Sequence, residues 1–161
     1  MARYLFDTDA LSFVTDNRLR YYPDFAEFLQ RMSSEQQFTC TPVVGEMYAG
    51  IPHHRDPTLI KTRIEQVLQR LTILPLDRTA AEKFGSLRAR LQKKGEMLQD
   101  MDLLIAACAL TNGMTLVTGN ENHFSRIREL PLWVVHPRGV REHSDKPYQV
   151  GKKKTVKKRD S

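Results

Sequence analysis

The sequence predicts a single α/β domain with a mainly parallel central sheet flanked by helices. Short apolar runs alternate along the chain with longer segments in which apolar residues recur at helical spacing. Alternation of this kind favours parallel strands joined by crossover helices. The chain has 161 residues, which is long enough to bury one core. Residues 1–137 contain the whole alternating pattern, and residues 138–161 are expected to be a C-terminal extension.

The predicted strands are short apolar runs bounded by polar or turn-forming residues. They span residues 3–6, 38–41, 72–76, 114–118 and 133–135. Pro75 interrupts the third run. Because proline cannot donate a backbone hydrogen bond, this strand is expected at an edge or at its own end.

The predicted helices are recognised by their capping residues and by one apolar face. Helices are expected over residues 8–16, from Asp24 to Met32, from Pro42 to Gly50, after Asp56-Pro57, from Thr79 to Gly95, from Asp100 to Gly113 and over residues 120–127. Asp24 and Thr79 each have a glutamate three residues later, which is capping-box spacing. The helix after Asp100 is apolar on almost all sides, so we expect it to be buried.

The positive charge of the chain is concentrated at its C-terminal end. Of the formal net charge of +6, residues 151–161 contribute +5, from six basic side chains and Asp160. A basic segment of this kind is typical of a disordered, solvated tail, and nucleic-acid contact is the alternative. Without a membrane-length apolar run or a signal peptide, the chain is expected in the cytoplasm. Cys40 and Cys108 lie in apolar segments and are expected to be buried thiols.

Three carboxylates are placed where predicted elements begin or end. Asp7 follows the first strand, Glu46 lies early in the helix after Pro42, and Asp102 lies in the first turn of the apolar helix. Side chains at the carboxyl ends of parallel strands converge on one edge of the sheet. Converging acids repel one another unless a cation neutralises them. With few histidine or cysteine ligands nearby, Mg²⁺ or Mn²⁺ is favoured over zinc.

Each acid also has a purely structural interpretation. Asp7 could cap the helix over residues 8–16. Asp102 could stabilise its own helix, because a negative charge near a helix N-terminus interacts favourably with the macrodipole. Glu46 could be a solvated helix residue. Asp100 is expected to cap the apolar helix, which leaves Asp102 without a structural role.

Four segments, in this order and spacing, resemble the PIN-domain ribonucleases, in particular the VapC-type toxins of toxin–antitoxin pairs. These segments are LFDTDAL, GEMYAG, MDLLIAACAL and LVTGNENHF, and the resemblance covers roughly residues 1–137. It implies that Asp7, Glu46 and Asp102 are catalytic metal-binding residues and that Thr118 supports the site. The implied reaction is Mg²⁺- or Mn²⁺-dependent hydrolysis of RNA phosphodiester bonds by an endoribonuclease. The implied partners are an RNA substrate, a small antitoxin protein and a second copy of the chain, with no membrane.

Two positions depart from the family pattern. The family often has a fourth acid after the TG or TN turn, where this chain has Asn120. The amide can still donate an oxygen to a metal, but without charge, so a second ion should bind more weakly. Asp9 stands where asparagine or serine is common and is expected to add negative charge.

Cations for the RNA phosphates are expected on the long helix before Gly95. The candidates are Arg88, Arg90, Lys93 and Lys94, because RNA binding needs positive charge that the rest of residues 1–150 largely lacks. A solvated helix face is the alternative for each of them. His123 lies near the expected cleft, and RNA contact is weighed there against a capping or surface role.

Two other functions remain open from the sequence. Asp7-Thr8-Asp9 after a strand is also typical of haloacid-dehalogenase-type phosphatases, in which the first aspartate attacks phosphorus covalently. That assignment gives Glu46 no role, and no convincing strand precedes Asp102. The second alternative is a non-catalytic PIN-like module that binds RNA.

Overall fold

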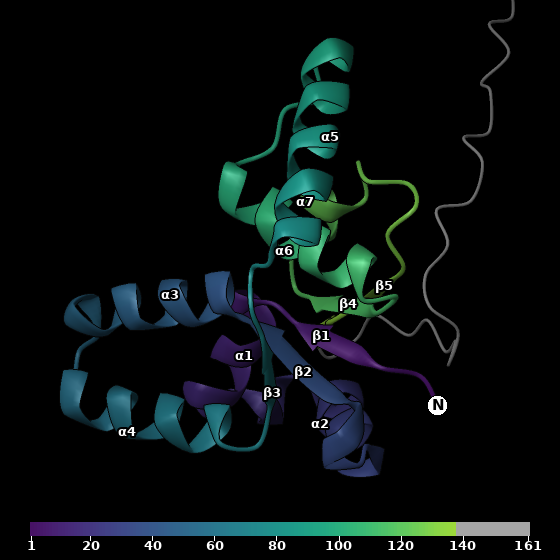
Figure 1. The fold of residues 1–161 in the computed structure, drawn as a ribbon. Coiled ribbons are helices and arrows are strands. Elements are labelled where there is room, and N and C mark those ends of the chain that lie inside the picture. The colour runs from purple at the N-terminus through teal and green to yellow at the C-terminus, as the bar shows by residue number, and fades with distance from the viewer. Residues whose placement is uncertain (138–161) are drawn as a thin grey trace, which may run out of the picture.

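The protein is built around a five-stranded sheet in which every strand pair is parallel. The structure is a computed structural model, and it describes residues 1–137. The strand order is β3-β2-β1-β4-β5. The strands are β1 (Tyr4–Phe6), β2 (Gln37–Cys40), β3 (Thr72–Leu74), β4 (Thr115–Thr118) and β5 (Leu132–Val134). The predicted parallel α/β architecture is therefore confirmed, and β3, which precedes Pro75, lies at the edge as expected (Figure 1).

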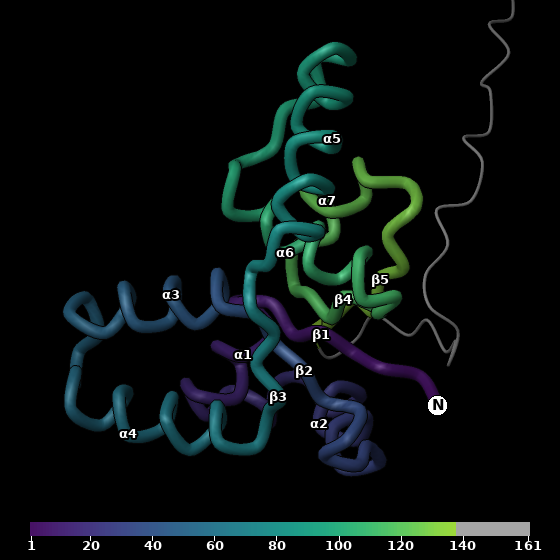
Figure 2. The backbone as a smooth tube through the Cα atoms, in the orientation of Figure 1, coloured from purple at the N-terminus to yellow at the C-terminus, as the bar shows by residue number. Residues whose placement is uncertain are grey.

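Seven α-helices connect and cover the strands of the described chain. They are α1 (Thr8–Thr15), α2 (Pro23–Arg31), α3 (Thr41–Gly50), α4 (Pro57–Leu68), α5 (Arg78–Lys94), α6 (Asp100–Thr111) and α7 (Glu121–Phe124). Short 3₁₀ turns lie at Leu19–Tyr21, Ser34–Gln36 and Ile51–His53. In the backbone trace, α5 and α6 lie above the strands and α2 lies below them (Figure 2).

The strand order reverses direction at β1, and this reversal determines where a site can form. From β1 the chain first adds β2 and β3 on one side, and later β4 and β5 on the other. Leu5 pairs with Phe38 of β2 and with Leu116 of β4, so the carboxyl ends of the three strands share one edge. In open α/β sheets, ligands bind at that edge where the order reverses.

The core is formed mainly by α6 and the central strands. Leu103 and the run from Ile105 to Ala109 are buried, as the apolar composition of this helix predicts. On another face of the core, Trp133 stacks on Phe28 with ring centroids 4.2 Å apart, and the rings of Phe28 and Tyr4 form a T-shaped pair. Cys40 and Cys108 are buried free thiols, as expected.

Three predicted helix caps are wrong by one or more residues. Pro23, not Asp24, begins α2, because the fixed φ of proline suits the first helical position. Asp77, not Thr79, caps α5 by accepting from the Ala80 amide at 2.8 Å, and Glu82 pairs with Arg78 instead. Asp100 is the first residue of α6 and accepts from Arg88 Nε at 2.9 Å, while the N-cap residue is Gln99.

Other predicted boundaries agree with the structure to within a few residues. Asp56 caps α4 through the Leu59 amide at 2.9 Å, and Gly95 ends α5 in the left-handed region at φ +67°. Pro42 is the second rather than the first residue of α3. Over residues 1–137, no helix combines the length and apolar character needed to cross a membrane. The predicted C-terminal extension and basic tail, residues 138–161, lie outside the described residues.

Candidate functional site

Asp7 lies at the point where the strand order reverses. It follows β1 directly, and its backbone amide donates to the Val117 carbonyl of β4 at 3.1 Å, which continues the pairing of the two strands. Its side chain also caps α1, because Oδ1 accepts from the Ala10 amide at 2.8 Å. The capping interpretation of Asp7 is thus correct, and it coexists with a place in the site.

The Asp7 carboxyl is buried, with 3% of the residue exposed. The pKa of Asp7 is raised to about 8, mainly by burial and to a smaller extent by the nearby charges of Asp9 and Asp102. Hydrogen bonds from the Thr118 hydroxyl and the Ala10 amide act in the opposite direction. Without a cation, the fold therefore holds Asp7 largely protonated at neutral pH.

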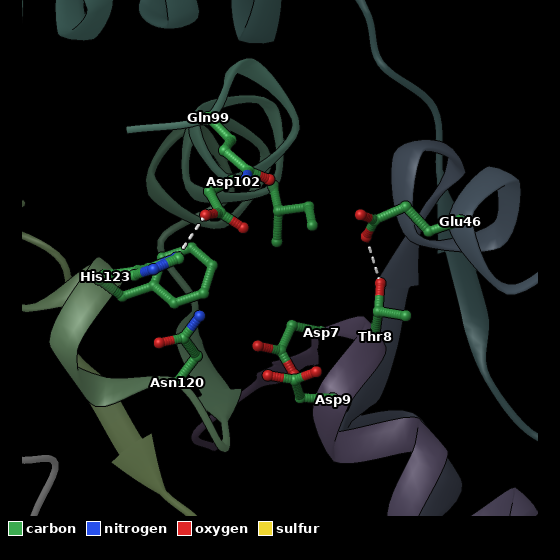
Figure 3. A pocket seen from close by; sticks show the side chains of 10 residues that line it. Asp7, Thr8, Asp9, Glu46, Gln99, Asp102, Asn120 and His123 are labelled. Atoms are coloured by element: carbon green, nitrogen blue, oxygen red, sulfur yellow. Dashed lines mark hydrogen bonds and ion pairs between the residues drawn. The ribbon is translucent and has the colours of Figure 1, made fainter. Parts of the chain in front are cut away.

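Glu46 and Asp102 approach the same region from two other helices. Glu46 lies on α3, and its Oε2 accepts a hydrogen bond from the Thr8 hydroxyl at the start of α1. Asp102 lies in the first turn of α6, and its Oδ2 lies 2.8 Å from His123 Nδ1 on α7. Figure 3 shows both carboxylates directed toward a common space, with Asp7 opposite them.

Asp9 and Asn120 complete the polar lining on the side of β1 and β4. Asp9 lies in the first turn of α1, and burial together with the charge of Asp102 raises its pKa. Asn120 follows β4, and its backbone amide donates to the Thr118 hydroxyl at 2.9 Å. Thr118 thus lies beside both Asp7 and Asn120, and its supporting role in the site stays a prediction.

These side chains line one pocket of about 200 Å³. Its lining consists of Asp7, Thr8, Asp9, Glu46, Gln99, Asp102, Ile105, Asn120, His123 and Phe124. Every residue proposed from the sequence as a metal ligand is in this set, together with Asp9. Four carboxylates from α1, α3, α6 and the end of β1 therefore converge although up to 95 positions separate them, from Asp7 to Asp102.

The four predicted RNA-binding cations do not line the pocket. Arg88 pairs with Asp100 at 2.9 Å, and Arg90 pairs with Glu129 at 2.6 Å. Lys93 and Lys94 lie exposed in the last turn of α5. Their role in RNA binding stays a prediction.

Thr8, Gln99 and His123 are the polar pocket residues whose place in the site could not be established from the sequence. His123 is partly exposed, as a surface role predicts, but it also lines the pocket and contacts Asp102; RNA contact by its side chain stays a prediction. One signal was available: His123 follows the N-cap residue Asn120 by three positions, in a short helix that begins directly after the end of β4. Nothing comparable indicated Thr8, whose contact with Glu46 spans 38 positions.

The chemistry of the donor set fits a hard divalent cation. Carboxylate and amide oxygens are the ligands that Mg²⁺ and Mn²⁺ prefer. Within residues 1–137, however, no three histidine, cysteine, aspartate or glutamate side chains are gathered as a direct chelate. An open ring of acids suits Mg²⁺ in particular, because Mg²⁺ usually keeps several water ligands.

Comparison with known proteins gives a consistent family assignment. Residues 4–130 match the PIN domain. The chain is 32% identical over 129 residues to ribonuclease VapC2 of Haemophilus influenzae, covering 79% of this chain and 93% of the relative. It is 27% identical, with the same coverage, to the tRNA(fMet)-specific endonuclease VapC of Shigella flexneri. Among solved structures, VapBC2 from Rickettsia felis bound to a promoter DNA fragment has a similar fold, with a TM-score of 0.74 at 24% identity over 83% of this chain and 98% of that one.

Proposed function

The chain belongs to the PIN-domain family, among the VapC-type ribonucleases, and we propose that its acidic pocket hydrolyses RNA with a bound Mg²⁺ or Mn²⁺ ion. The observation that supports the metal is the convergence of Asp7, Asp9, Glu46 and Asp102 on one pocket. Such a concentration of acids is unfavourable unless it is protonated or neutralised by a cation.

Asp7, Glu46 and Asp102 are the proposed metal ligands, with the amide oxygen of Asn120 as a neutral fourth donor. When bound, a divalent ion would lower the pKa of a coordinated water and offset negative charge on the scissile phosphate. The protein orients the ligands through hydrogen bonds: Thr118 contacts Asp7, Thr8 contacts Glu46 and His123 contacts Asp102. The hydroxyl and imidazole donors restrict how far each carboxylate can rotate, which favours one ligand geometry.

RNA would approach the pocket across the surface that carries the first turn of α6. Arg88 lies over this turn through its ion pair with Asp100. Lys93 and Lys94 extend the positive charge along α5. We assign these cations, with Arg90, to phosphate contacts that position the substrate without selecting its sequence.

The protein is the ribonuclease toxin of a toxin–antitoxin pair, as its VapC-type relatives indicate. We propose that a small antitoxin protein binds and inhibits it, that two copies of the chain form a homodimer, and that it acts in the cytoplasm, where its RNA substrates are. VapBC assemblies are toxin–antitoxin systems, and one of them binds promoter DNA.

The phosphatase alternative loses its basis in the structure and in the family assignment. Asp102 lies inside a helix that follows a loop, not at the end of a strand. Glu46 lines the pocket, although the phosphatase mechanism has no use for it. The alternative of a non-catalytic RNA-binding module is tested by measuring RNA cleavage directly.

The test compares two aspartates two positions apart on α6. Asp102→Asn changes a pocket acid, whereas the control Asp100→Asn changes an exposed acid outside the pocket. Each purified protein is incubated with bacterial total RNA, and with tRNA(fMet) as a defined substrate, in Mg²⁺ or Mn²⁺. We expect Asp102→Asn to lose at least about 100-fold in cleavage rate, the size of loss typical when an electrostatic catalytic group is removed. Asp100→Asn should cut like the parent. Equal rates for the folded parent and Asp102→Asn would show that the pocket is not the nuclease site.

A further inference from the structure

His123 connects two elements of the pocket that are not adjacent in sequence. It lies on α7, which follows β4, and its Nδ1 is 2.8 Å from Oδ2 of Asp102 on α6. In the tautomer that carries its hydrogen on Nδ1, the imidazole donates to the carboxylate. Figure 3 shows the imidazole on the opposite side of Asp102 from Glu46.

The N-terminus of the helix that carries Asp102 provides an alternative hydrogen-bonding site for the Asp102 carboxylate. Gln99, the N-cap residue of α6, makes no capping hydrogen bond through its side chain. Asp102 is the third residue of this helix, the position from which an acidic side chain can reach back to the N-cap amide. Free amides at the helix N-terminus would therefore compete with His123 for the Asp102 carboxylate.

We propose that His123 is a positioning residue that holds Asp102 toward the pocket for the divalent ion. The inference rests on the metal-dependent function proposed above. Binding of Oδ2 by the imidazole leaves Oδ1 of Asp102 for the ion. Phe124, which is 1% exposed, anchors α7 beside the pocket, so the imidazole is attached to a packed element.

The other two proposed ligands, Asp7 and Glu46, are also contacted by a side chain from another position, in each case a threonine hydroxyl. The Thr118 hydroxyl contacts Asp7, and the Thr8 hydroxyl contacts Glu46. Each of the three proposed ligands thus has a side-chain donor from another position. Asp102 is 17% exposed and His123 39% exposed at their side chains. Because this contact is more open to water than the Asp7 site, its loss should affect metal binding more than folding.

The experiment measures Mn²⁺ binding by isothermal titration calorimetry on the full-length chain and three variants. In His123→Ala the donor is lost, whereas in His123→Asn the amide NH₂ group can take the place of Nδ1–H. The matched control is Asn122→Ala, an exposed neighbour on α7 that does not line the pocket. We expect the dissociation constant to rise about tenfold in His123→Ala, as for other groups that orient metal ligands. His123→Asn and Asn122→Ala should stay within about twofold of the parent.

RNA cleavage provides a second readout that distinguishes positioning from a direct catalytic role. His123→Ala should need more Mg²⁺ for half-maximal cleavage, while kcat at saturating Mg²⁺ stays near that of the parent. The inference is overturned if His123→Ala binds Mn²⁺ like the parent, or if His123→Asn binds as weakly as His123→Ala. A parent protein that neither binds Mn²⁺ nor cuts RNA with metal would overturn the proposed function as well. Thermal unfolding of each variant checks that the comparison is between folded proteins.

Discussion

Replacing Asp7 by asparagine should reduce the pH dependence of stability in the metal-free protein. Burial raises the pKa of Asp7 from 3.8 to about 8. The folded state therefore binds a proton that the unfolded state releases at neutral pH. Between these two values, the contribution of Asp7 to the free energy of unfolding falls as pH rises, by about 1.4 kcal/mol per unit. Below pH 3.8 Asp7 is protonated in both the folded and the unfolded state, so its contribution to stability no longer changes with pH.

From pH 5.5 to 7.5, the parent should therefore lose about 2 to 3 kcal/mol more stability than Asp7→Asn. Asparagine keeps the α1 cap, because it is also a preferred N-cap residue whose oxygen can accept from the Ala10 amide. The other titrating groups are common to both proteins, so the difference between their slopes isolates Asp7.

The assay is urea unfolding in EDTA at pH 5.5, 6.5 and 7.5, followed by the fluorescence of the single tryptophan, Trp133, which packs against Phe28. Asp100→Asn is the control, since Asp100 is exposed, and it should retain the parental slope. Adding Mg²⁺ at pH 7.5 should stabilise the parent but not Asp7→Asn. Equal pH slopes for the parent and Asp7→Asn would refute the assignment of Asp7 as a buried acid that stores a proton until a cation binds.

Three further predictions concern the edge of the pocket and its surroundings. Asn120→Asp should bind Mn²⁺ at least about tenfold more tightly in calorimetry, because it adds a charged oxygen ligand; unchanged affinity would remove position 120 from the ligand set. Gly119→Ala should lower the free energy of unfolding by about 1 kcal/mol in urea, because the new Cβ would lie 3.0 Å from the Phe13 ring; a stability equal to the parent's would contradict this. The double change Lys93→Ala and Lys94→Ala should weaken RNA binding and lower the slope of log K against log salt by about 1.4. An unaltered slope would exclude these lysines from the interface.

The order of the elements could be predicted because apolar periodicity is a local property of the chain. The five strands and the buried α6 each have a pattern that is visible within a few residues, and the structure contains them in the predicted order. Helix caps were less predictable, since neighbouring polar residues compete for the same amides. Asp77 rather than Thr79 caps α5 because its side chain is the one that reaches the Ala80 amide.

In the candidate site, too, some features could be predicted from the sequence and others could not. Asp7, Glu46 and Asp102 could be chosen from the sequence because strand ends and helix starts share one edge of a parallel sheet, and Asn120 was implied by the resemblance to the family. The contacts that orient them could not, because they join side chains from different elements, as Thr8 does with Glu46 and His123 with Asp102. Such pairs depend on rotamers and helix packing, which leave no periodic signal. Arg88 was predicted as a phosphate contact, but its ion pair with Asp100 became visible only in the structure.

In the proposed function, the acidic pocket hydrolyses RNA by using water and a divalent ion. The most direct measurement is the cleavage of end-labelled RNA in Mg²⁺ and in EDTA, with chemical analysis of the new termini. Attack by water predicts cleavage that requires the metal and products with linear phosphate ends. Cleavage at the same rate in EDTA, or products ending in a 2′,3′-cyclic phosphate, would contradict it, because the RNA hydroxyl rather than water would then be the nucleophile.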